Sequence, residues 1–463
     1  MTPTTVLHLG LGSFHRAHQA VYLQRLHEAG DRTWSIVGGN IRPDMEAVVE
    51  ALAAQDCRYT VETVSTAGER TYTQVGAIGR VVPWSEDLAG LVAAGADPAT
   101  RIISFTVTEA GYYLDPANAP DPSFPDLAAD IEAVRAGRPV RTLYGALTLI
   151  LRARRAAQAG PVTLLCCDNL RHNGDRSRKG FLGFLDLVGD GALKAWVEAH
   201  TTSPNAMVDR ITPRPTPAVR DSVRAATGRD DAAALMAEDF LQWVIEDRFA
   251  AGRPAFERVG VEMVSSVDPY EEAKIRILNA SHSAIAWAGS LKGYRYIHEG
   301  TLDEEIRGIA QAYVTDDVIP CLTPSPLDLA AYRDTVLSRF ANVAIADTNQ
   351  RVAADGFSKI PGFIAPTIRE RLAAGGTIVA VAALPALFLA FLERWAAGDI
   401  PWTYQDQAMD PAVARAIVAA PDPVAALVAE RPLWAELTGD RRLESAIRAA
   451  RARLAPLSAQ ASA

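Results

Sequence analysis

Cysteine is scarce in this 463-residue chain, which has four, and their spacing excludes one kind of site. Cys57, Cys166, Cys167 and Cys321 contain no C-x-x-C pair, so they offer no structural zinc set. Adjacent cysteines such as Cys166 and Cys167 also rarely bridge each other. This usage is typical of a reduced, cytoplasmic protein in which buried thiols act as small apolar fillers.

Positive charge is also in short supply. The formal net charge is −9, and the isoelectric point is near 5.5. These values argue against a nucleic-acid-binding surface and a polybasic membrane anchor, whereas small neutral substrates remain compatible with them.

No stretch has the composition of a secretory leader or a membrane span. The N-terminus lacks a basic region and runs directly into an apolar segment, so we expect no signal peptide. The most apolar run, residues 378–392, is short for a span and is interrupted by Pro385. We predict that this run is a buried core helix.

The length of the chain predicts two domains, because one simple core does not grow to this size. Strands and helices alternate in the first half, although the pattern turns helical from about Ala232, and residues 261–267 indicate a strand or a crossover. Beyond Pro269 the pattern predicts helices over residues 271–290, 302–315, 327–340, 345–354, 364–374 and 377–397. We therefore predict an α/β, Rossmann-like domain over residues 1–268, an all-α domain over residues 269–463, and an active site in the cleft between them.

The chain opens on a dinucleotide-binding pattern. Residues 6–9 predict a strand that runs into Gly10-Leu11-Gly12-Ser13-Phe14, then a helix ending at Gly30, then a second strand over residues 35–38. The glycines let the backbone approach a pyrophosphate, and the start of the helix supplies N–H groups. His15 stands where this motif usually has its third glycine, so the match is incomplete.

Two charged residues after the second predicted strand favour different cofactors. Asp44 would accept hydrogen bonds from the ribose hydroxyls and favour NAD, whereas Arg42 would attract a 2′-phosphate and favour NADP. A solvated loop explains both residues equally well.

His15 and His18 have H-x-x-H spacing, which can bind a metal. No third ligand is evident nearby, so packing or hydrogen bonding beside the cofactor is the preferred interpretation.

Two further predicted strands, residues 102–107 and 162–166, lead into polar residues. Ligands of open α/β sheets lie at this edge, so Thr108, Glu109 and Asn169 are candidate site residues. An asparagine turn that leads to Asn173-Gly174 is the alternative for Asn169.

Residues 274–282 place a potential base, an amide and an imidazole on one predicted helix. At 100° per residue from Lys274, His282 falls at about 80° and Asn279 at about 140°, so the three share one broad face. A base on this face could take a proton from a substrate while its neighbours hold the oxygen. The alternative is an ordinary amphipathic helix with a solvated lysine. The position of the helix, directly after the nucleotide-binding half, favours catalysis.

Together these motifs resemble the polyol-specific long-chain dehydrogenases, the family that includes mannitol 2-dehydrogenase. The most specific motif is K-x(4)-N-x(2)-H, present as Lys274, Asn279 and His282. Further matching segments span nearly the whole chain, at residues 10–18, 106–109, 167–170, 208–213, 347–348, 351 and 355–359.

The resemblance implies oxidation of a secondary alcohol by NAD(P) without zinc or another metal. It makes Lys274 the general base, and it makes Asn279 and Asn169 hydrogen-bond donors to the reacting oxygen. It implies further roles for three groups: substrate orientation by His282, Asp209, Arg351 and Lys359; a proton path at Glu271; and cofactor binding by Gly10, Gly12, Ser13, Phe14, Asn40, Asp44, Thr108, Glu109 and Asn169. Without the resemblance, Arg351 and Lys359 are typical of surface charges.

A lysine base needs a lowered pKa, because the ordinary value is about 10.4. Loss of hydration or a nearby positive charge lowers it. Arg276 and the nicotinamide cation are two candidate sources of that charge.

Several segments are most similar to bacterial family members that oxidise D-arabinitol to D-xylulose with NAD: residues 272–274, 284–289, 296–299 and 348–359. The alternatives within the family are oxidation of D-mannitol to D-fructose and fructuronate-type reduction, and the latter should need an extra cationic contact that we cannot identify. From another class, a dinucleotide-binding sensor without catalysis is disfavoured by the intact Lys274, Asn279 and His282. The resemblance also implies a monomer.

Overall fold

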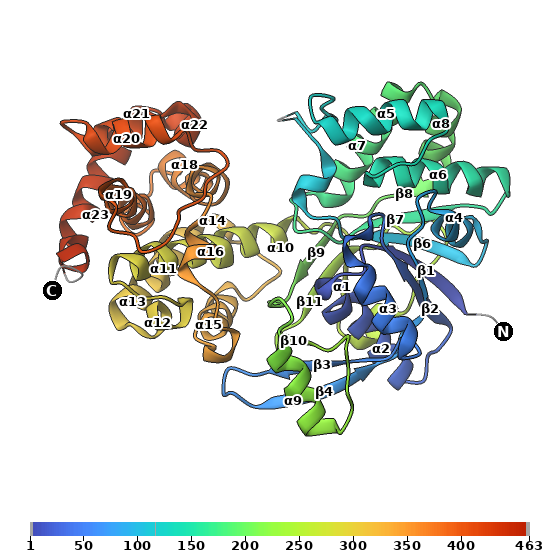
Figure 1. The fold of residues 1–463 in the computed structure, drawn as a ribbon. Helices are drawn as coiled ribbons and strands as arrows, with labels where there is room; N and C mark the ends of the chain where they lie inside the picture. Colours follow the sequence, from blue (N-terminus) through green and yellow to red (C-terminus); the bar gives the residue numbers. More distant parts are fainter. Residues whose placement is uncertain (1–2, 116, 460–463) are drawn as a thin grey trace. The chain divides into compact units, whose positions relative to one another are not determined.

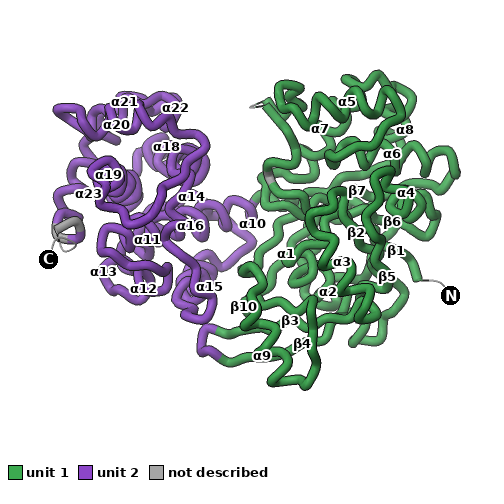
Figure 2. Tube along the Cα trace, viewed as in Figure 1, with its two compact units in different colours: residues 1–65, 69–268 green, residues 66–68, 269–463 purple. Residues whose placement is uncertain are grey.

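The computed structural model describes residues 3–115 and 117–459 (Figure 1). Its contacts divide the chain into two compact units (Figure 2). Unit 1 comprises residues 1–65 and 69–268, and unit 2 comprises residues 66–68 and 269–463. Unit 1 is α/β and unit 2 is all-α, as the sequence patterns predict.

A six-stranded parallel sheet forms the centre of unit 1, in the order β5-β2-β1-β6-β7-β8. This order, with the first strand in the middle, is that of a doubly wound dinucleotide-binding fold. The bounds are β1 (Thr4–Leu9), β2 (Trp34–Gly39), β5 (Ile78–Val82), β6 (Thr100–Phe105), β7 (Val162–Cys166) and β8 (Thr201–Thr202).

The strands of this sheet are apolar on both faces because both faces are covered. Val6 and Ile102 pack into one hydrophobic core, whereas their neighbours Leu7 and Ile103 pack into another. Such alternation follows from the two-residue repeat of a strand. The first core is covered by α2 (Gln19–Glu28) and α3 (Glu46–Ala54). The second is covered by α4 (Ala89–Ala96), α5 (Pro125–Ala136), α6 (Leu143–Ala156), α7 (Asn173–Val188) and α8 (Gly191–His200).

Unit 1 also contains two small sheets, of which the sequence predicted only β12 (Glu262–Val264), as the strand or crossover over residues 261–267. One has the order β10-β3-β4, with β3 (Tyr59–Val64), β4 (Arg70–Val75) and β10 (Leu235–Glu238), and α9 (Pro217–Thr227) packs beside it. The other has the order β12-β11-β9, with β9 (Ala206–Asp209), β11 (Gln242–Glu246) and β12 (Glu262–Val264).

The predicted helical pattern from residue 232 is therefore wrong, since β10 and β11 lie there. Trp243, Val244 and Ile245 favour a strand through their shape, and the run is too short for a stable helix. Their partners, β3 and β9, come from distant parts of the chain and fix the outcome.

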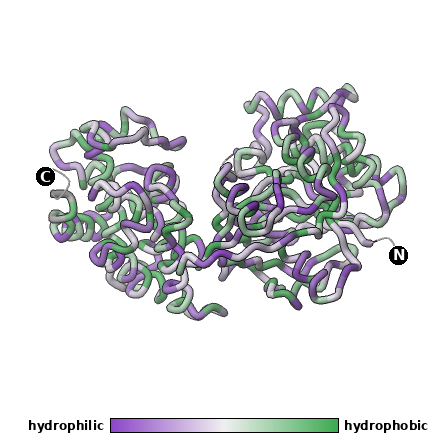
Figure 3. Tube along the Cα trace, turned by 60° about the horizontal axis from the view of Figure 1, so that its bottom comes forward, coloured by the Kyte–Doolittle hydropathy of each residue, from purple (hydrophilic) through white to green (hydrophobic). Residues whose placement is uncertain are grey.

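Unit 2 is built from helices around one hydrophobic core that includes Trp287, Phe388 and Trp434. Hydrophobic and hydrophilic residues are interspersed along the helices (Figure 3), as expected of elements that bury one face. The helices are α10 (Asp268–Ala273), α11 (Ala280–Leu291), α12 (Ile297–Leu302), α13 (Glu304–Ala312), α14 (Ile319–Leu322), α15 (Leu329–Phe340), α16 (Asn349–Ala353), α17 (Gly356–Lys359), α18 (Ala365–Ala373), α19 (Ala383–Ala397), α20 (Pro411–Ala419), α21 (Pro423–Ala429), α22 (Arg431–Trp434) and α23 (Arg441–Ala459).

The apolar run around Pro385 forms the buried helix α19, which confirms the predicted core helix. Within the described residues, no helix is long and apolar enough to cross a membrane. In the part of unit 2 that the structure describes, three π-helical turns interrupt the helices: η4 (Lys274–Asn279), η5 (Tyr313–Val318) and η7 (Ile360–Ile364).

Candidate active site

The glycine turn of unit 1 follows β1 directly. The amide of Gly10 donates to the carbonyl of Gly39 over 2.9 Å, and the amide of Thr106 donates to the carbonyl of Leu9 over 3.0 Å. The turn is therefore fixed to the ends of β2 and β6, at the sheet edge where dinucleotides bind in this fold.

Only glycine fits at Gly10. Its φ is +100°, and a Cβ there would lie 2.0 Å from the carbonyl oxygen of Thr106. Gly12 differs, since the nearest atom to a Cβ there would be 3.9 Å away. The space above Gly12 therefore leaves its backbone open to a ligand, as the sequence motif predicts. Ser13 and Phe14 begin the short helix α1 (Ser13–Ala17) that follows.

Asn40 supports the same turn from the end of β2. Its Oδ1 accepts a hydrogen bond from the amide of Leu11 over 2.7 Å. Its Nδ2 is buried and, among the described residues, has no hydrogen-bond partner. A buried donor left without a partner is costly, so this amide suits a ligand that brings an acceptor.

The two charged candidates after β2 lie in different surroundings. Asp44 is exposed in the turn η1 (Pro43–Met45). The guanidinium of Arg42 pairs with Asp126 at 3.2 Å and also donates to the Tyr113 hydroxyl and the Arg141 carbonyl. Arg42 therefore already has partners, whereas Asp44 faces solvent.

Asp168 organises the ends of β6 and β7, although sequence reasoning gave it no role. Its carboxylate accepts hydrogen bonds from the amides of Val107 and Thr108 and from the Tyr112 hydroxyl, over 2.5 to 3.1 Å. Thr108 is held with a φ of +67°, and Asn169 follows Asp168 at the exposed end of β7. The side chain of Glu109 lies outside the described residues.

The three histidines near the turn are engaged in packing and hydrogen bonds. The rings of His8 and His15 stack with centroids 3.4 Å apart, and His18 Nε2 lies 2.8 Å from the carbonyl oxygen of Gln242. Burial lowers the pKa of His8 to about 3 and lowers that of His15. Both rings are therefore neutral near pH 7 and can stack without charge repulsion.

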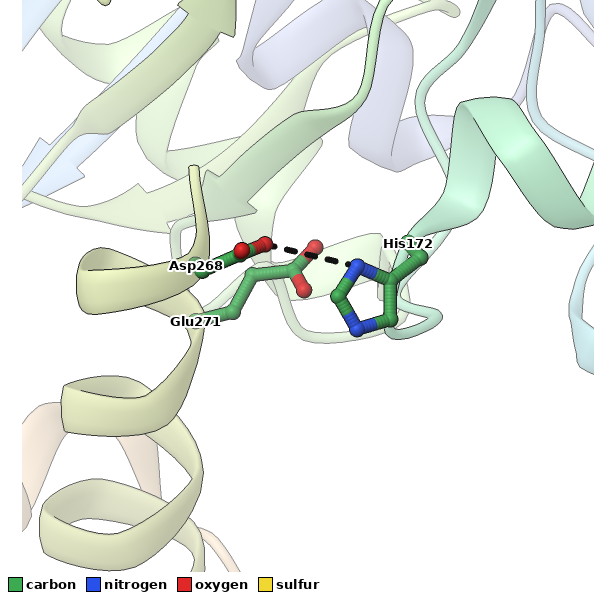
Figure 4. A group of neighbouring side chains, drawn as sticks. All are labelled: His172, Asp268 and Glu271. Carbon is green, nitrogen blue, oxygen red and sulfur yellow. Dashed lines mark ion pairs between the residues drawn. The ribbon is translucent and has the colours of Figure 1, made fainter. Parts of the chain in front are cut away.

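His172, for which the sequence predicts no role, pairs with Asp268, the first residue of α10. Its Nδ1 is 3.4 Å from Oδ1 of Asp268, and Glu271 follows one helical turn further along α10 (Figure 4). Both side chains of the His172–Asp268 pair are more than half exposed, so we expect this ion pair to contribute little to stability.

Lys274, Asn279 and His282 lie on the continuous helix formed by α10, η4 and α11. The prediction of regular α-helical spacing is wrong here, because residues 274–279 form the π-turn η4. Residues five apart lie about 140° apart around an α-helix. In a π-helix the hydrogen bonds themselves join residues five apart, so these residues lie more nearly above one another. The π-turn thus brings Lys274 and Asn279 closer to a common face than the sequence alone predicts.

Arg276, one of the two candidate sources of positive charge for Lys274, is paired with two carboxylates. Its guanidinium pairs with Glu272 at 2.7 Å and makes two hydrogen bonds of 2.6 Å to Glu370. Two carboxylates outweigh one guanidinium, which leaves this cluster with a net negative charge.

Four candidate substrate-binding residues were predicted, and three of them lie together in unit 2. His282 Nε2 is 3.4 Å from Oδ2 of Asp347, and the guanidinium of Arg351 binds the same carboxylate through two nitrogens. The Nζ of Lys359 donates to the carbonyl of Val352 over 2.6 Å. The fourth residue, Asp209, is buried at the end of β9 in unit 1.

Asp347 is the residue of this cluster to which sequence reasoning gave no role. Although burial opposes ionisation, His282 and Arg351 lower the pKa of Asp347 below its usual range. The ring of His282 also stacks on Phe340, with centroids 4.2 Å apart. Asp347 and Phe340 therefore fix the orientation of His282. The i, i+4 spacing of Asp347 and Arg351 was the available sequence signal for their pairing.

Lys359 gives a pH-dependent prediction. Loss of hydration is the largest cause that lowers its pKa from 10.5 to about 8. Between these values the unfolded chain binds more protons at this residue than the folded chain does. The free energy of unfolding should therefore rise with pH across this window, by a contribution on the order of 3 kcal/mol.

The measurement is the Tm of the wild type and of Lys359→Met at about pH 7.5 and about pH 10. Other titrating groups are common to both proteins and cancel in the comparison. The Tm of the wild type minus that of the variant should increase at the higher pH. A difference that does not change with pH would contradict the lowered pKa.

Comparisons with known proteins cover almost the whole chain. Residues 4–258 match the mannitol dehydrogenase Rossmann domain, and residues 266–455 match the mannitol dehydrogenase C-terminal domain. A D-arabinitol 4-dehydrogenase of Ralstonia nicotianae is 60% identical over 452 residues, which are 97% of this chain and 96% of that protein. A D-arabinitol 4-dehydrogenase of Klebsiella pneumoniae is 53% identical over 94% of this chain and 95% of its own length.

A solved structure is similar over the same extent. The mannitol 2-dehydrogenase of Pseudomonas fluorescens, in a ternary complex with NAD and D-mannitol, aligns with a TM-score of 0.82. It is 34% identical, and the alignment covers 99% of this chain and 93% of that chain.

Proposed function

This chain belongs to the mannitol dehydrogenase family, and from that premise we propose that it oxidises D-arabinitol to D-xylulose with NAD, reversibly. The observation that carries the proposal is the identity of 60% and 53% with two D-arabinitol 4-dehydrogenases over nearly the full length of both proteins. The catalytic motif Lys274, Asn279 and His282 supports an active enzyme over a sensor that only binds the cofactor.

The proposed chemistry assigns each residue a role that suits its side chain. Lys274 takes the proton from the substrate hydroxyl as general base. Asn279 and Asn169 donate hydrogen bonds to the oxygen as it gains negative charge. We further propose that Glu271 passes the proton to solvent. We also propose that His282, Asp209, Arg351 and Lys359 orient the substrate hydroxyls.

NAD, when bound, supplies the nicotinamide that accepts the hydride. The open space above Gly12 and the unpartnered Nδ2 of Asn40 fit such a ligand, and Arg42, already paired with Asp126, does not favour a 2′-phosphate. We propose that the cofactor is held by Gly10, Gly12, Ser13, Phe14, Asn40, Asp44, Thr108, Glu109 and Asn169.

We propose that the reaction needs no metal. A lysine base and two amide donors supply the proton transfer and the charge stabilisation that zinc provides in other alcohol oxidations. Activity should therefore survive extended dialysis against EDTA. Loss of activity that only added Zn²⁺ restores would contradict this proposal.

A substrate panel with NAD and with NADP tests the proposed function. We expect the highest kcat/KM with D-arabinitol and NAD, among D-arabinitol, D-mannitol, D-sorbitol, xylitol, ribitol and D-fructuronate. A higher kcat/KM with D-mannitol would favour the mannitol 2-dehydrogenase alternative, and efficient reduction of D-fructuronate would favour the uronate reductase alternative. Nucleotide binding with no turnover of any of these compounds would favour the sensor.

The charge of Asp347 gives a prediction for substrate affinity. Asp347→Asn keeps the shape of the side chain but removes the charge that holds His282 and Arg351. A hydrogen bond to a charged group contributes about 1.5–3 kcal/mol, so the KM for the polyol should rise about 10- to 100-fold. The Kd for NAD should not change. An unchanged polyol KM in steady-state assays would contradict a substrate-orienting role for this cluster.

We also propose that the enzyme is a cytoplasmic monomer. The four cysteines are free, which suits a reducing compartment. Light scattering on the purified chain should give a mass near 49.7 kDa, and a mass twice as large would contradict the monomer.

A further inference from the structure

The backbone hydrogen bonds of the helix formed by α10, η4 and α11 change their spacing at the π-turn η4. The amide of Ala280 bonds back five residues to the carbonyl of Ile275, whereas α-helical bonding resumes in α11. An α-helical amide at Ser281 reaches back four residues, to the carbonyl of Ile277. The change from five-residue to four-residue hydrogen bonding therefore skips the carbonyl of Arg276.

A buried side chain occupies that position. The Tyr313 hydroxyl donates a hydrogen bond of 2.8 Å to the carbonyl oxygen of Arg276. Tyr313 is fully buried and begins the second π-turn, η5, which packs against η4. Burial raises the pKa of this hydroxyl, so it remains a protonated donor across the working pH range.

Arg276 is also held through its side chain. Its two hydrogen bonds to Glu370 connect η4 to α18, directly after the third π-turn, η7. The carbonyl and the guanidinium of one residue are therefore anchored by two other helices. Without such anchors, a π-turn can return to α-helical bonding, which rotates the residues on either side of it relative to each other.

From this geometry we propose that Tyr313 is a positioning residue, whose hydroxyl stabilises the π-turn that sets Lys274 against Asn279. The inference rests on the proposed function, because it concerns the proposed base and one of its partner amides. Tyr313 acts through the backbone of Arg276, and we assign it no contact with the substrate.

Tyr313→Phe tests the inference, since it removes the hydroxyl and keeps the ring in the core. We expect kcat for D-arabinitol oxidation to fall about 10- to 100-fold, the Kd for NAD to stay within about twofold, and the pH at which kcat is half-maximal to shift. Hydrogen exchange should become faster at the amides of residues 276–281. In a variant that was only less stable, the faster exchange would extend beyond residues 276–281, and the kinetic effect would not be limited to kcat.

Tyr294→Phe is the matched control. The Tyr294 hydroxyl also donates a hydrogen bond in unit 2, but its acceptor, at 3.0 Å, is Asp303 rather than a residue of η4. We expect its kinetic constants to remain within about twofold of the wild type. An equal fall in kcat in both variants, or an unchanged kcat in Tyr313→Phe, would overturn the inference.

Two further comparisons keep the outcome decisive. If Tyr313→Phe does not fold, Glu370→Gln weakens the other anchor, and an unchanged kcat and pH profile in that variant would overturn the inference. The wild type is assayed in parallel with the polyol panel: an inactive wild type refutes the proposed function, whereas an active wild type with an equally active Tyr313→Phe refutes only the role of Tyr313.

Discussion

Lys274→Ala should lower kcat for polyol oxidation near neutral pH about 10³- to 10⁴-fold, because it removes the group that takes the hydroxyl proton. The Kd for NAD, measured by titration, should stay within about threefold, since the proposed cofactor residues lie in the other unit. The cause is chemical rather than structural, so the Tm should change little.

Lys292→Ala is the control for the loss of a lysine from the same region. Lys292 follows α11 and pairs with Asp303 at 2.8 Å and Glu305 at 3.0 Å. Its removal should lower the Tm, because the side chains of Lys292 and Asp303 are largely buried, but it should leave kcat unchanged. Turnover by Lys274→Ala at the wild-type rate would remove the assigned base.

Gly10→Ala should raise the Kd for NAD at least 100-fold. The new Cβ would lie 2.0 Å from the Thr106 carbonyl oxygen, in a backbone conformation with φ +100°, so the turn must move. The obstructing oxygen belongs to the backbone of Thr106, the residue that follows β6. It therefore cannot rotate away as a side chain would. The Tm should fall as well.

Two alanine variants separate binding from folding in this experiment. At Gly12 a Cβ meets no atom closer than 3.9 Å, and φ is −83°, so Gly12→Ala should keep the wild-type Tm while still weakening NAD binding. At Gly191 a Cβ has open space and no proposed ligand nearby, so Gly191→Ala should change neither. A Kd for NAD within threefold of the wild type in Gly10→Ala would contradict the proposed cofactor site.

The sequence predicted the central sheet and the helical second half because their signals are local. Residues 6–9 and 162–166 are short apolar runs bounded by glycine or polar residues, and both became strands. Strands β10 and β11 were not predicted, because they acquire their character from β3 and β9, which are distant in sequence. Local periodicity carries no information about such pairing.

The sequence names candidate site residues, whereas their local geometry comes from the structure. Lys274, Asn279 and His282 were found from their spacing and from the family resemblance, but the α-helical wheel misplaced them because η4 adds a π-turn. That turn depends on Tyr313 and Glu370, which lie 37 and 94 residues after Arg276. The sequence likewise predicted no role for Asp168 or Asp347. Each role arises because several groups from separate parts of the chain converge on one carboxylate.

The most direct test of the account is oxidation of D-arabinitol that carries deuterium at carbon 4, with NAD and the purified wild-type protein. We expect D-xylulose as the product, with one deuterium in each reduced nicotinamide and none released to water. D-ribulose as the product, which requires oxidation at carbon 2, or ketose formation without deuterium in the nicotinamide, would contradict it.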